Sequence, residues 1–397
     1  MSLLHRARTL ASLKGRVSST TLRHSGFAAA ALVFVAAVAV ANPFPTEYRS
    51  DAAGSSEKVI PLPTLDTAAY NARMLALAHY RYPAAASSTA SSTPASATTT
   101  ARAATSTLAA LPFSTATTSV SVPGRPWPVP TVYPEYGALL PFNRIVAYYG
   151  NFYSRQMGVL GEYPEDQLLA MLASTTAAWS AADPSTPVIP AIQYIAVVAQ
   201  ATAGKEGKYI LRMPDDQIDH ALEMAEKVRG LLFLDVQVGK STVEYEIPQL
   251  EKYLKMPNVH LAIDPEFSMK FGDAPGHVIG TFDAADINYT AGYLAGLVRA
   301  DHLPPKILVV HRFTEDMVTN YQKIRPLPEV QIVMDMDGWG SQAKKKNTYM
   351  RVIQSEPVQF TGIKLFYKND LKPPSTGLLT TNEVLNLTPA PIYIQYQ

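Results

Sequence analysis

At the centre of the chain lies Val259-His-Leu-Ala-Ile-Asp-Pro-Glu-Phe267, a short apolar run that ends in two carboxylates. Side chains alternate along a strand, so Ala262, Asp264 and Glu266 point to one side of it. Charged side chains are rarely buried without a partner, which makes two acids unusual at the end of a core strand. The pattern predicts a strand whose carboxyl end carries a polar site.

Two further apolar runs carry same-side polar residues at their carboxyl ends. They are Leu232-Phe-Leu-Asp-Val-Gln-Val238, with Asp235 and Gln237 on one face, and Val330-Gln-Ile-Val-Met-Asp-Met-Asp337, with Asp335 and Asp337. Three strands with the same arrangement indicate one shared site at their carboxyl ends.

From Pro134 onward the sequence repeats a strand followed by a helix. The expected strands span 144–151, 188–198, 231–238, 259–267, 278–282, 306–313, 330–337 and 360–367. The expected helices span 164–172, 215–229, 247–254, 283–300, 314–323 and 341–354, and the tail run 392–396 is expected to form a strand or plug on the barrel. Eight such units in about 235 residues match a closed parallel barrel.

The predicted fold is therefore α/β, a closed parallel (β/α)8 barrel of the TIM type. Its strands are rich in Val, Ile and Leu, as expected for strands covered on both faces. An open doubly wound sheet is the alternative, but it usually has fewer strands and often a Gly-rich first turn, which Tyr149-Gly-Asn-Phe152 does not provide.

The sequence before the barrel divides into three expected segments. Basic residues precede the apolar run Phe27–Ala41, which ends in a small-x-small pattern, so residues 1–41 are expected to be a signal peptide, or otherwise an uncleaved membrane anchor. Residues 42–83 should hold one helix, over 66–80 with Asp66 as its cap. Residues 84–130, rich in Ala, Ser, Thr and Pro, should form a disordered linker. The barrel domain is then 131–397, in an exported protein.

Composition excludes several functions. The 397 residues carry a net charge of +1, which gives no reason to expect a nucleic-acid partner. The absence of cysteine excludes disulfides, thiol catalysis and a cysteine-bound zinc. We expect a monomer that needs no cofactor and no metal.

In barrels of this type the active site lies at the carboxyl ends of the strands. Polar and aromatic residues expected there suit sugar recognition, because hydroxyl groups need donors and acceptors and pyranose faces stack on aromatic rings. The predicted substrate-binding residues are Tyr149, Asn151, Gln193, Gln237, His311, Asp337, Trp339, Lys364 and Tyr367.

The acids indicate a chemistry. Glycoside hydrolysis needs one carboxylic acid held protonated and usually a second carboxylate. Asp264 and Glu266 are two positions apart, roughly 6.5 Å between Cα atoms. A neighbouring negative charge keeps a carboxyl protonated longer, so Glu266 is predicted to be the general acid and Asp264 to orient it. Asp235 or Asp335 would be the second carboxylate.

An Asp-x-Glu at the end of the fourth strand resembles the secreted (β/α)8 glycoside hydrolases, including the family 18 chitinases and family 25 lysozymes. In the family 18 pattern the last acid of the motif is the proton donor, a role that the resemblance gives to Glu266. This chain has His260 and Ala262 where the longer motif carries acids. The resemblance implies an exported hydrolase that acts on a polysaccharide or a cell-wall glycan.

Two other functions stay open. The barrel could be a non-catalytic, surface-tethered glycan-binding or scaffold domain, with its acids paired to basic residues. A metal-dependent hydrolase would need several histidines at strand ends, and His311 is the only one expected there. A catalytic pair should lie in an open cleft with its carboxyl groups about 5 to 9.5 Å apart.

Overall fold

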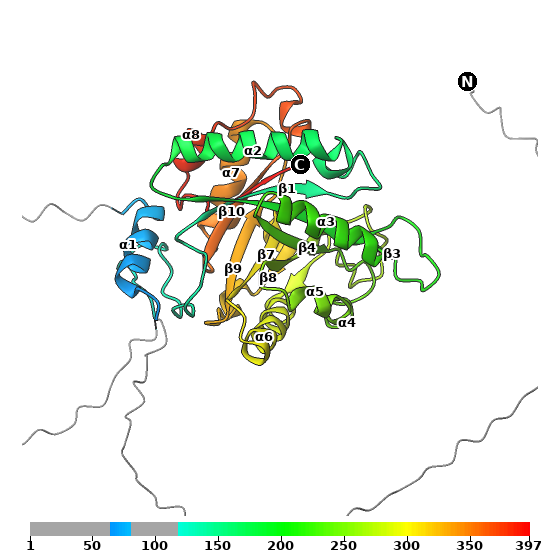
Figure 1. Ribbon diagram of the computed structural model, residues 1–397, viewed down its shortest axis with the longest axis horizontal. Coiled ribbons are helices and arrows are strands. Elements are labelled where there is room, and N and C mark those ends of the chain that lie inside the picture. Colours follow the sequence, from blue (N-terminus) through cyan, green and yellow to red (C-terminus); the bar gives the residue numbers. More distant parts are fainter. Residues whose placement is uncertain (1–63, 81–117) are drawn as a thin grey trace, which may run out of the picture. The chain divides into compact units, whose positions relative to one another are not determined.

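A computed structural model describes residues 64–80 and 118–397 (Figure 1). The expected signal segment and most of the expected linker lie outside these residues. None of the helices in the described ranges is long and apolar enough to cross a membrane.

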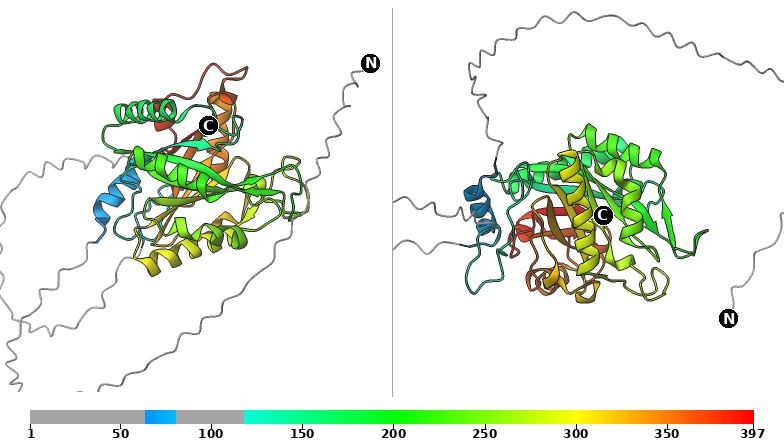
Figure 2. Two further views of the ribbon diagram at one scale, coloured as in Figure 1. Left: turned by 45° about the vertical axis from the view of Figure 1, so that its right-hand side comes forward. Right: turned by 90° about the horizontal axis from the view of Figure 1, so that it is seen from below.

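Eight parallel strands form a closed barrel, which confirms the predicted fold (Figures 1 and 2). The barrel strands, in order around it, are β1 (Arg144–Gly150), β2 (Val188–Ala199), β4 (Leu231–Val236), β5 (Val259–Ile263), β7 (Lys306–Arg312), β9 (Val330–Met336), β10 (Phe360–Leu365) and β11 (Tyr393–Tyr396). The barrel closes where β11 pairs with β1, with Ile145 opposite Tyr393. A short strand, β3 (Ile210–Arg212), pairs with the end of β2 in the antiparallel direction.

One strand was assigned wrongly. The expected strand 278–282 is not in the barrel: its end forms the two-residue strand β6 (Phe282–Asp283), which pairs with β8 (Val318–Thr319) in a separate sheet. Gly280 interrupts the run, and the chain passes close to the backbone after β5, since a Cβ atom on Gly280 would lie 2.6 Å from the Pro265 carbonyl oxygen. The tail supplies the eighth strand instead, because its run of β-branched and aromatic residues has no such interruption.

Helices cover the outside of the barrel strands (Figure 2). The α-helices are α1 (Thr67–Leu77), α2 (Glu165–Ala182), α3 (Asp215–Lys227), α4 (Val243–Glu246), α5 (Glu251–Leu254), α6 (Ala284–Asp301), α7 (Gln342–Tyr349) and α8 (Thr381–Leu385). The helix expected over 314–323 is wrong: two 3₁₀ turns, Glu315–Met317 and Tyr321–Lys323, flank β8. A π-helical turn, Met350–Gln354, continues α7.

The barrel interior changes from apolar to polar along the strands. Its lower part packs Ala147, Phe233, Val309 and Val333 together. Two positions further along four of the strands, the inward residues are Tyr149, Asp235, His311 and Asp335. Because inward positions recur every second residue, the sequence places a polar layer directly above an apolar one.

Helix α1 packs against the apolar part of the barrel. Tyr70 is fully buried, and its ring makes edge contacts with Tyr133, Phe142 and Phe360. Asp66 caps the helix by accepting from the Ala69 backbone, as expected. Residues 118–130 also contact the barrel, where the Trp127 indole donates to the Gln354 carbonyl at 2.9 Å. The domain boundaries stay a prediction, but the folded unit includes these segments.

The packing of α1 can be tested with Met74→Ala. Met74 is 3% exposed and belongs to the same apolar cluster as the barrel strands. The substitution should lower the free energy of unfolding by about 2 kcal/mol, the lower end for a buried Met-to-Ala change. Thr67→Ala, on the exposed side of the same helix, is the control. Equal urea midpoints for the two variants would show that α1 does not stabilise the barrel.

Candidate active site

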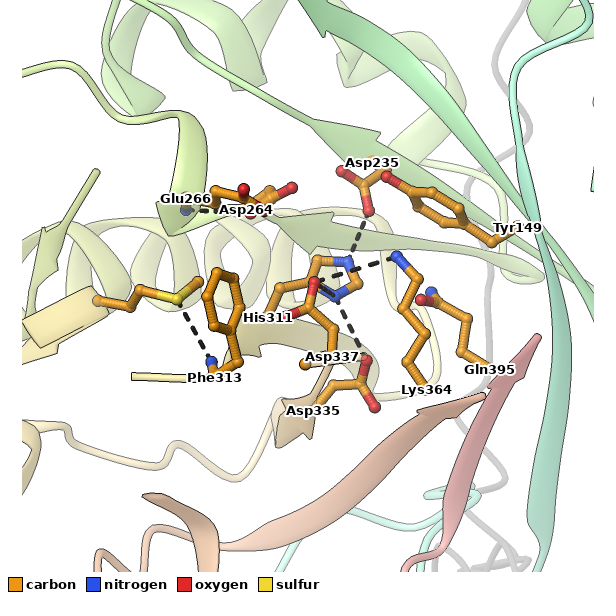
Figure 3. A network of polar contacts seen from close by, with 12 residues as sticks. Tyr149, Asp235, Asp264, Glu266, His311, Phe313, Asp335, Asp337, Lys364 and Gln395 are labelled. Atoms are coloured by element: carbon orange, nitrogen blue, oxygen red, sulfur yellow. Dashed lines mark hydrogen bonds and ion pairs between the residues drawn. The ribbon is translucent and has the colours of Figure 1, made fainter. Parts of the chain in front are cut away.

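A cavity of about 710 Å³ opens at the carboxyl ends of the barrel strands. Three acids line it: Asp264, Glu266 and Asp337 (Figure 3). Asp264 and Glu266 follow β5, and Asp337 follows β9, so the site joins two strands that are not neighbours in the barrel. Three of the acids that the sequence placed at strand ends therefore lie together in one cavity.

The local sequence explains how the first two acids are placed. β5 ends at Ile263, and Asp264 caps a 3₁₀ turn over Pro265–Phe267 by accepting from the Glu266 backbone N–H at 3.0 Å. Pro265 fixes its own φ and has no N–H to offer a neighbouring strand. The chain therefore leaves the sheet at this point, with Glu266 at the cavity wall.

The three carboxyl groups are close enough for their charges to interact. One oxygen of each lies within 4.8 Å of an oxygen of the others. Burial, and then the charge of Asp337, raise the pKa of Glu266 to about 7. Burial also raises the pKa of Asp264 and of Asp337, so the site holds protons that separate carboxylates would release.

Asp337 has the closest cations of the three acids. The Lys364 Nζ lies 4.0 Å from its Oδ2, and the His311 Nδ1 lies 3.5 Å from the same atom. Both cations oppose the rise in the Asp337 pKa that burial causes. The Lys364 ammonium also lies over the ring of Tyr149, 3.6 Å from its centroid. Of the three acids in the cavity, Asp337 is therefore the one whose ionised form neighbouring cations stabilise most.

The amide of Gln237, which follows the neighbouring strand β4, holds Asp264. Gln237 donates to the Asp264 Oδ2 at 3.3 Å and to the Tyr149 hydroxyl at 3.4 Å. Burial and nearby acids, Asp235 first among them, raise the pKa of Tyr149, so its hydroxyl stays protonated. The predicted positions Tyr149 and Gln237 thus lie at the cavity beside an acid.

A buried layer under the cavity is centred on His311. Its Nε2 lies 2.8 Å from the Asp235 Oδ2, and its Nδ1 lies 3.3 Å from the Asp335 Oδ2 (Figure 3). Burial lowers the pKa of His311, but Asp235, Asp335 and Asp337 together raise it well above its usual value. His311 is thus an imidazolium fixed among three carboxylates, with no exposed surface.

Gln193 connects this layer to the strand that closes the barrel. Its Nε2 donates to the Asp235 Oδ2 at 2.6 Å, and its Oε1 accepts from Gln395 at 2.5 Å and from the Tyr393 hydroxyl. Gln193 itself is fully buried. Asp235, Asp335, Gln193 and His311 were predicted to face substrate; the structure places all four beneath the cavity lining.

Two predicted substrate-binding residues lie elsewhere. Asn151 is buried, and its Nδ2 donates to the Ile195 carbonyl at 3.0 Å. The Tyr367 hydroxyl lies 3.0 Å from that of Tyr148, outside the cavity lining. Asn151 misses the cavity because β1 already ends at Gly150. Tyr367 misses it because it lies three positions after the inward-facing Lys364, and alternation along a strand turns it outward. Trp339 and Lys364 do line the cavity.

Several cavity residues were missed. They are Gln156, Met157, Phe267, Phe313, Lys344, Arg351 and Phe366. Strand parity could have found two of them, because Phe313 and Phe366 each lie two positions beyond an inward residue. The others come from loops and short turns, from α7 and from the π-helical turn after it, for which the sequence carries no periodic signal.

The three acids could also hold a cation. Their oxygens are the ligand type that Ca²⁺ and Mg²⁺ prefer. The Lys364 ammonium beside Asp337 supplies positive charge at the same place and would oppose a bound cation. Histidine does not contribute, since both ring nitrogens of His311 face carboxylates below.

Fold and site together define a TIM-type α/β barrel with an acidic cavity at the carboxyl ends of its strands. No protein-family model matches the chain, and no curated protein matches it either. Among solved structures, it is similar to a GH5 xyloglucan-specific endo-β-1,4-glucanase from a metagenomic library, crystallised with cellotriose. The TM-score is 0.34 at 11% identity, over 65% of this chain and 88% of that one, which supports no inference about chemistry.

Proposed function

We propose that this protein hydrolyses glycosidic bonds of a polysaccharide or cell-wall glycan. The observation that carries the proposal is the pair Glu266 and Asp337 in one cavity, with carboxyl oxygens within 4.8 Å of each other. Glu266 has a pKa raised to about 7, which suits a general acid. Asp337 has two cations beside it, which suits a carboxylate that must stay ionised.

In the proposed reaction Glu266 gives its proton to the glycosidic oxygen, and the bond from the anomeric carbon to that oxygen breaks. The Asp337 carboxylate forms a bond to the anomeric carbon. Glu266, now ionised, then takes a proton from a water molecule whose oxygen replaces Asp337. The oxygen spacing is nearer to the separation of about 5 to 5.5 Å in retaining enzymes than to the wider one in inverting enzymes.

The proposed second carboxylate is Asp337, in place of Asp235 or Asp335, which the sequence suggested. Asp235 and Asp335 contact His311 under the cavity, so a sugar in the cavity would meet Asp337 first. Asp264 would keep its expected orienting role, because it binds the Glu266 backbone and is held by Gln237.

The proposal predicts the alkaline limb of the pH–rate profile. A general acid works only while protonated, so kcat/KM should fall as the pH rises through about 7, the raised pKa of Glu266. The same ionisation should lower stability: a raised pKa gives stability that is fully present at low pH and lost as the pH rises through about 7. A rate that keeps rising above pH 8 would exclude Glu266 as the acid.

The direct test of the function is a screen of the purified chain on peptidoglycan, chitin and mixed plant and microbial glycans, with new reducing ends as the readout. Wild-type chain should release them from at least one glycan, and Asp337→Asn should not. Binding without release by either would instead favour a glycan-binding barrel. Release that stops with EDTA and returns with Ca²⁺ or Mg²⁺ would favour a metal-dependent hydrolase using the three acids.

We also propose that the protein is exported and that a carbohydrate polymer is its partner. Export is supported by the basic residues ahead of Phe27–Ala41 and the small-x-small pattern at the end of that run. Retention of the run would tether the protein to a membrane. Mass spectrometry of the mature N-terminus distinguishes cleavage after Ala41 from an uncleaved tether.

A further inference from the structure

Two lysines flank the tryptophan at the edge of the cavity. Trp339 follows Asp337 by two residues, lines the cavity and is 48% exposed. The Lys344 Nζ lies 4.9 Å from the centre of its ring, and the Lys372 Nζ lies 5.2 Å from it. The expected stacking of a neutral pyranose on Trp339 would compete with these two ammonium groups.

The backbone fixes where Lys344 points. A Cβ atom on Gly340 would lie 2.6 Å from the Lys344 Cδ, so the lysine stem lies directly on the Gly340 backbone. Glycine at this position therefore leaves room for the Lys344 stem beside Trp339.

These two cations lack a carboxylate partner, in contrast to their neighbours. Lys345 pairs with Asp370 and Lys346 pairs with Glu383. In the described part of the chain no carboxylate lies within ion-pair distance of Lys344 or Lys372. A cation–π contact leaves the ammonium hydrogens free to bind an anion.

Basic side chains also line the cavity, on the side of α7 and β10, where Asp337 is the acid of the lining. Lys344 and Arg351 line it from the α7 side and Lys364 from β10, whereas Asp264 and Glu266 follow β5. Arg351 is partly neutralised by Glu315, 3.0 Å away. The unpaired positive charge is concentrated around Trp339, next to the proposed cleavage point.

We propose that Lys344 and Lys372, held by Trp339, bind an anionic group on the glycan, a carboxylate or sulfate on a sugar unit next to the bond that is cleaved. The inference rests on the proposed function for the nature of the polymer. It assigns the substrate class: an acidic glycan rather than a neutral one.

The test measures binding by calorimetry of three oligosaccharides of equal length: a neutral glucan, an oligouronate and a sulfated galactan. Wild-type chain should bind an acidic oligomer about 10-fold more tightly than the neutral one, equivalent to about 1.4 kcal/mol. The preference should weaken in high salt. Whichever of the two acidic oligomers binds more tightly identifies the anion.

Lys344→Gln/Lys372→Gln should reduce the affinity for the acidic oligomer to that for the neutral one. The control, Lys252→Gln/Lys255→Gln, removes the same charge from α5 and its C-terminal cap, away from the cavity lining, and should keep the preference. Equal melting temperatures would verify folding.

Equal wild-type affinity for the three oligomers, no binding of either acidic one, or a preference that survives the Lys344/Lys372 change would each overturn the inference. Cleavage of neutral glycans without acidic preference would leave the proposed hydrolase standing and remove only this subsite. Lysine-dependent binding of an acidic oligomer without any cleavage would support the anionic subsite and contradict the proposed hydrolase.

Discussion

Glu266→Gln should lower glycosidase activity by about 10²- to 10⁴-fold, the usual contribution of a positioned general acid. The change keeps the shape of the side chain and removes the ionisable proton. Burial and Asp337 make ionised Glu266 unfavourable, which is why its pKa is raised to about 7. The melting temperature should therefore stay the same at pH 5 and exceed that of the wild type above pH 7.

Within the part of the chain that the structure describes, Glu266 lacks the basic partner that a structural ion pair would require. Its side chain lines the cavity, and the described residues place no arginine or lysine within ion-pair distance of it. Glu244→Gln, on the exposed side of α4, is the matched control and should change neither activity nor melting temperature. Full activity of Glu266→Gln together with a lower melting temperature would end the catalytic assignment.

His311→Leu should lower the free energy of unfolding by about 3–5 kcal/mol, the cost of removing one partner from a buried charge network. Asp235 and Asp335 are fully buried and would lose their imidazolium partner. Because the pKa of His311 is raised in the folded chain, the loss should be close to its maximum at about pH 7, near the unfolded pKa of histidine, and smaller at about pH 9. His311 stabilises the wild type fully below its unfolded pKa, and that contribution declines as the pH rises towards its raised folded pKa.

The chain offers a matched control for this effect. His260 on β5 is just as buried, but burial and Lys306 lower its pKa, so it is neutral. Its Nδ1 accepts from the Ile307 backbone at 3.1 Å. His260→Leu should cost about 1–3 kcal/mol, for the unpaired N–H, with little change between the same two pH values. Urea unfolding at both pH values measures all four energies; a pH-independent loss for His311→Leu would contradict the buried imidazolium.

The sequence predicted the barrel because strand periodicity and strand count are local signals. It placed one strand wrongly because 278–282 and 393–396 are both short apolar runs, and only tertiary pairing decides which one closes the barrel. The tail strand also brings Gln395, which binds Gln193, into the polar layer.

The site was predicted in part for a similar reason. Alternation identifies which side of a strand faces inward, so Asp235 and Asp337 were both found. It does not identify depth: Asp335 lies one inward step below Asp337, roughly 6.5 Å along the strand, and that step separates the buried layer from the cavity. Loop and α7 residues such as Lys344 follow no period, so their position at the cavity needed the structure.

The central claim is that Glu266 and Asp337 together hydrolyse a glycosidic bond. Proton NMR of the first product formed from a cleaved glycan tests it most directly, because the anomeric configuration reports whether a carboxylate attacked the sugar before water did. If Glu266 and Asp337 act together in this way, the product should appear first with the configuration of the substrate and only later mutarotate. An inverted first product would contradict the role of Asp337, and no product from any glycan would contradict the claim as a whole.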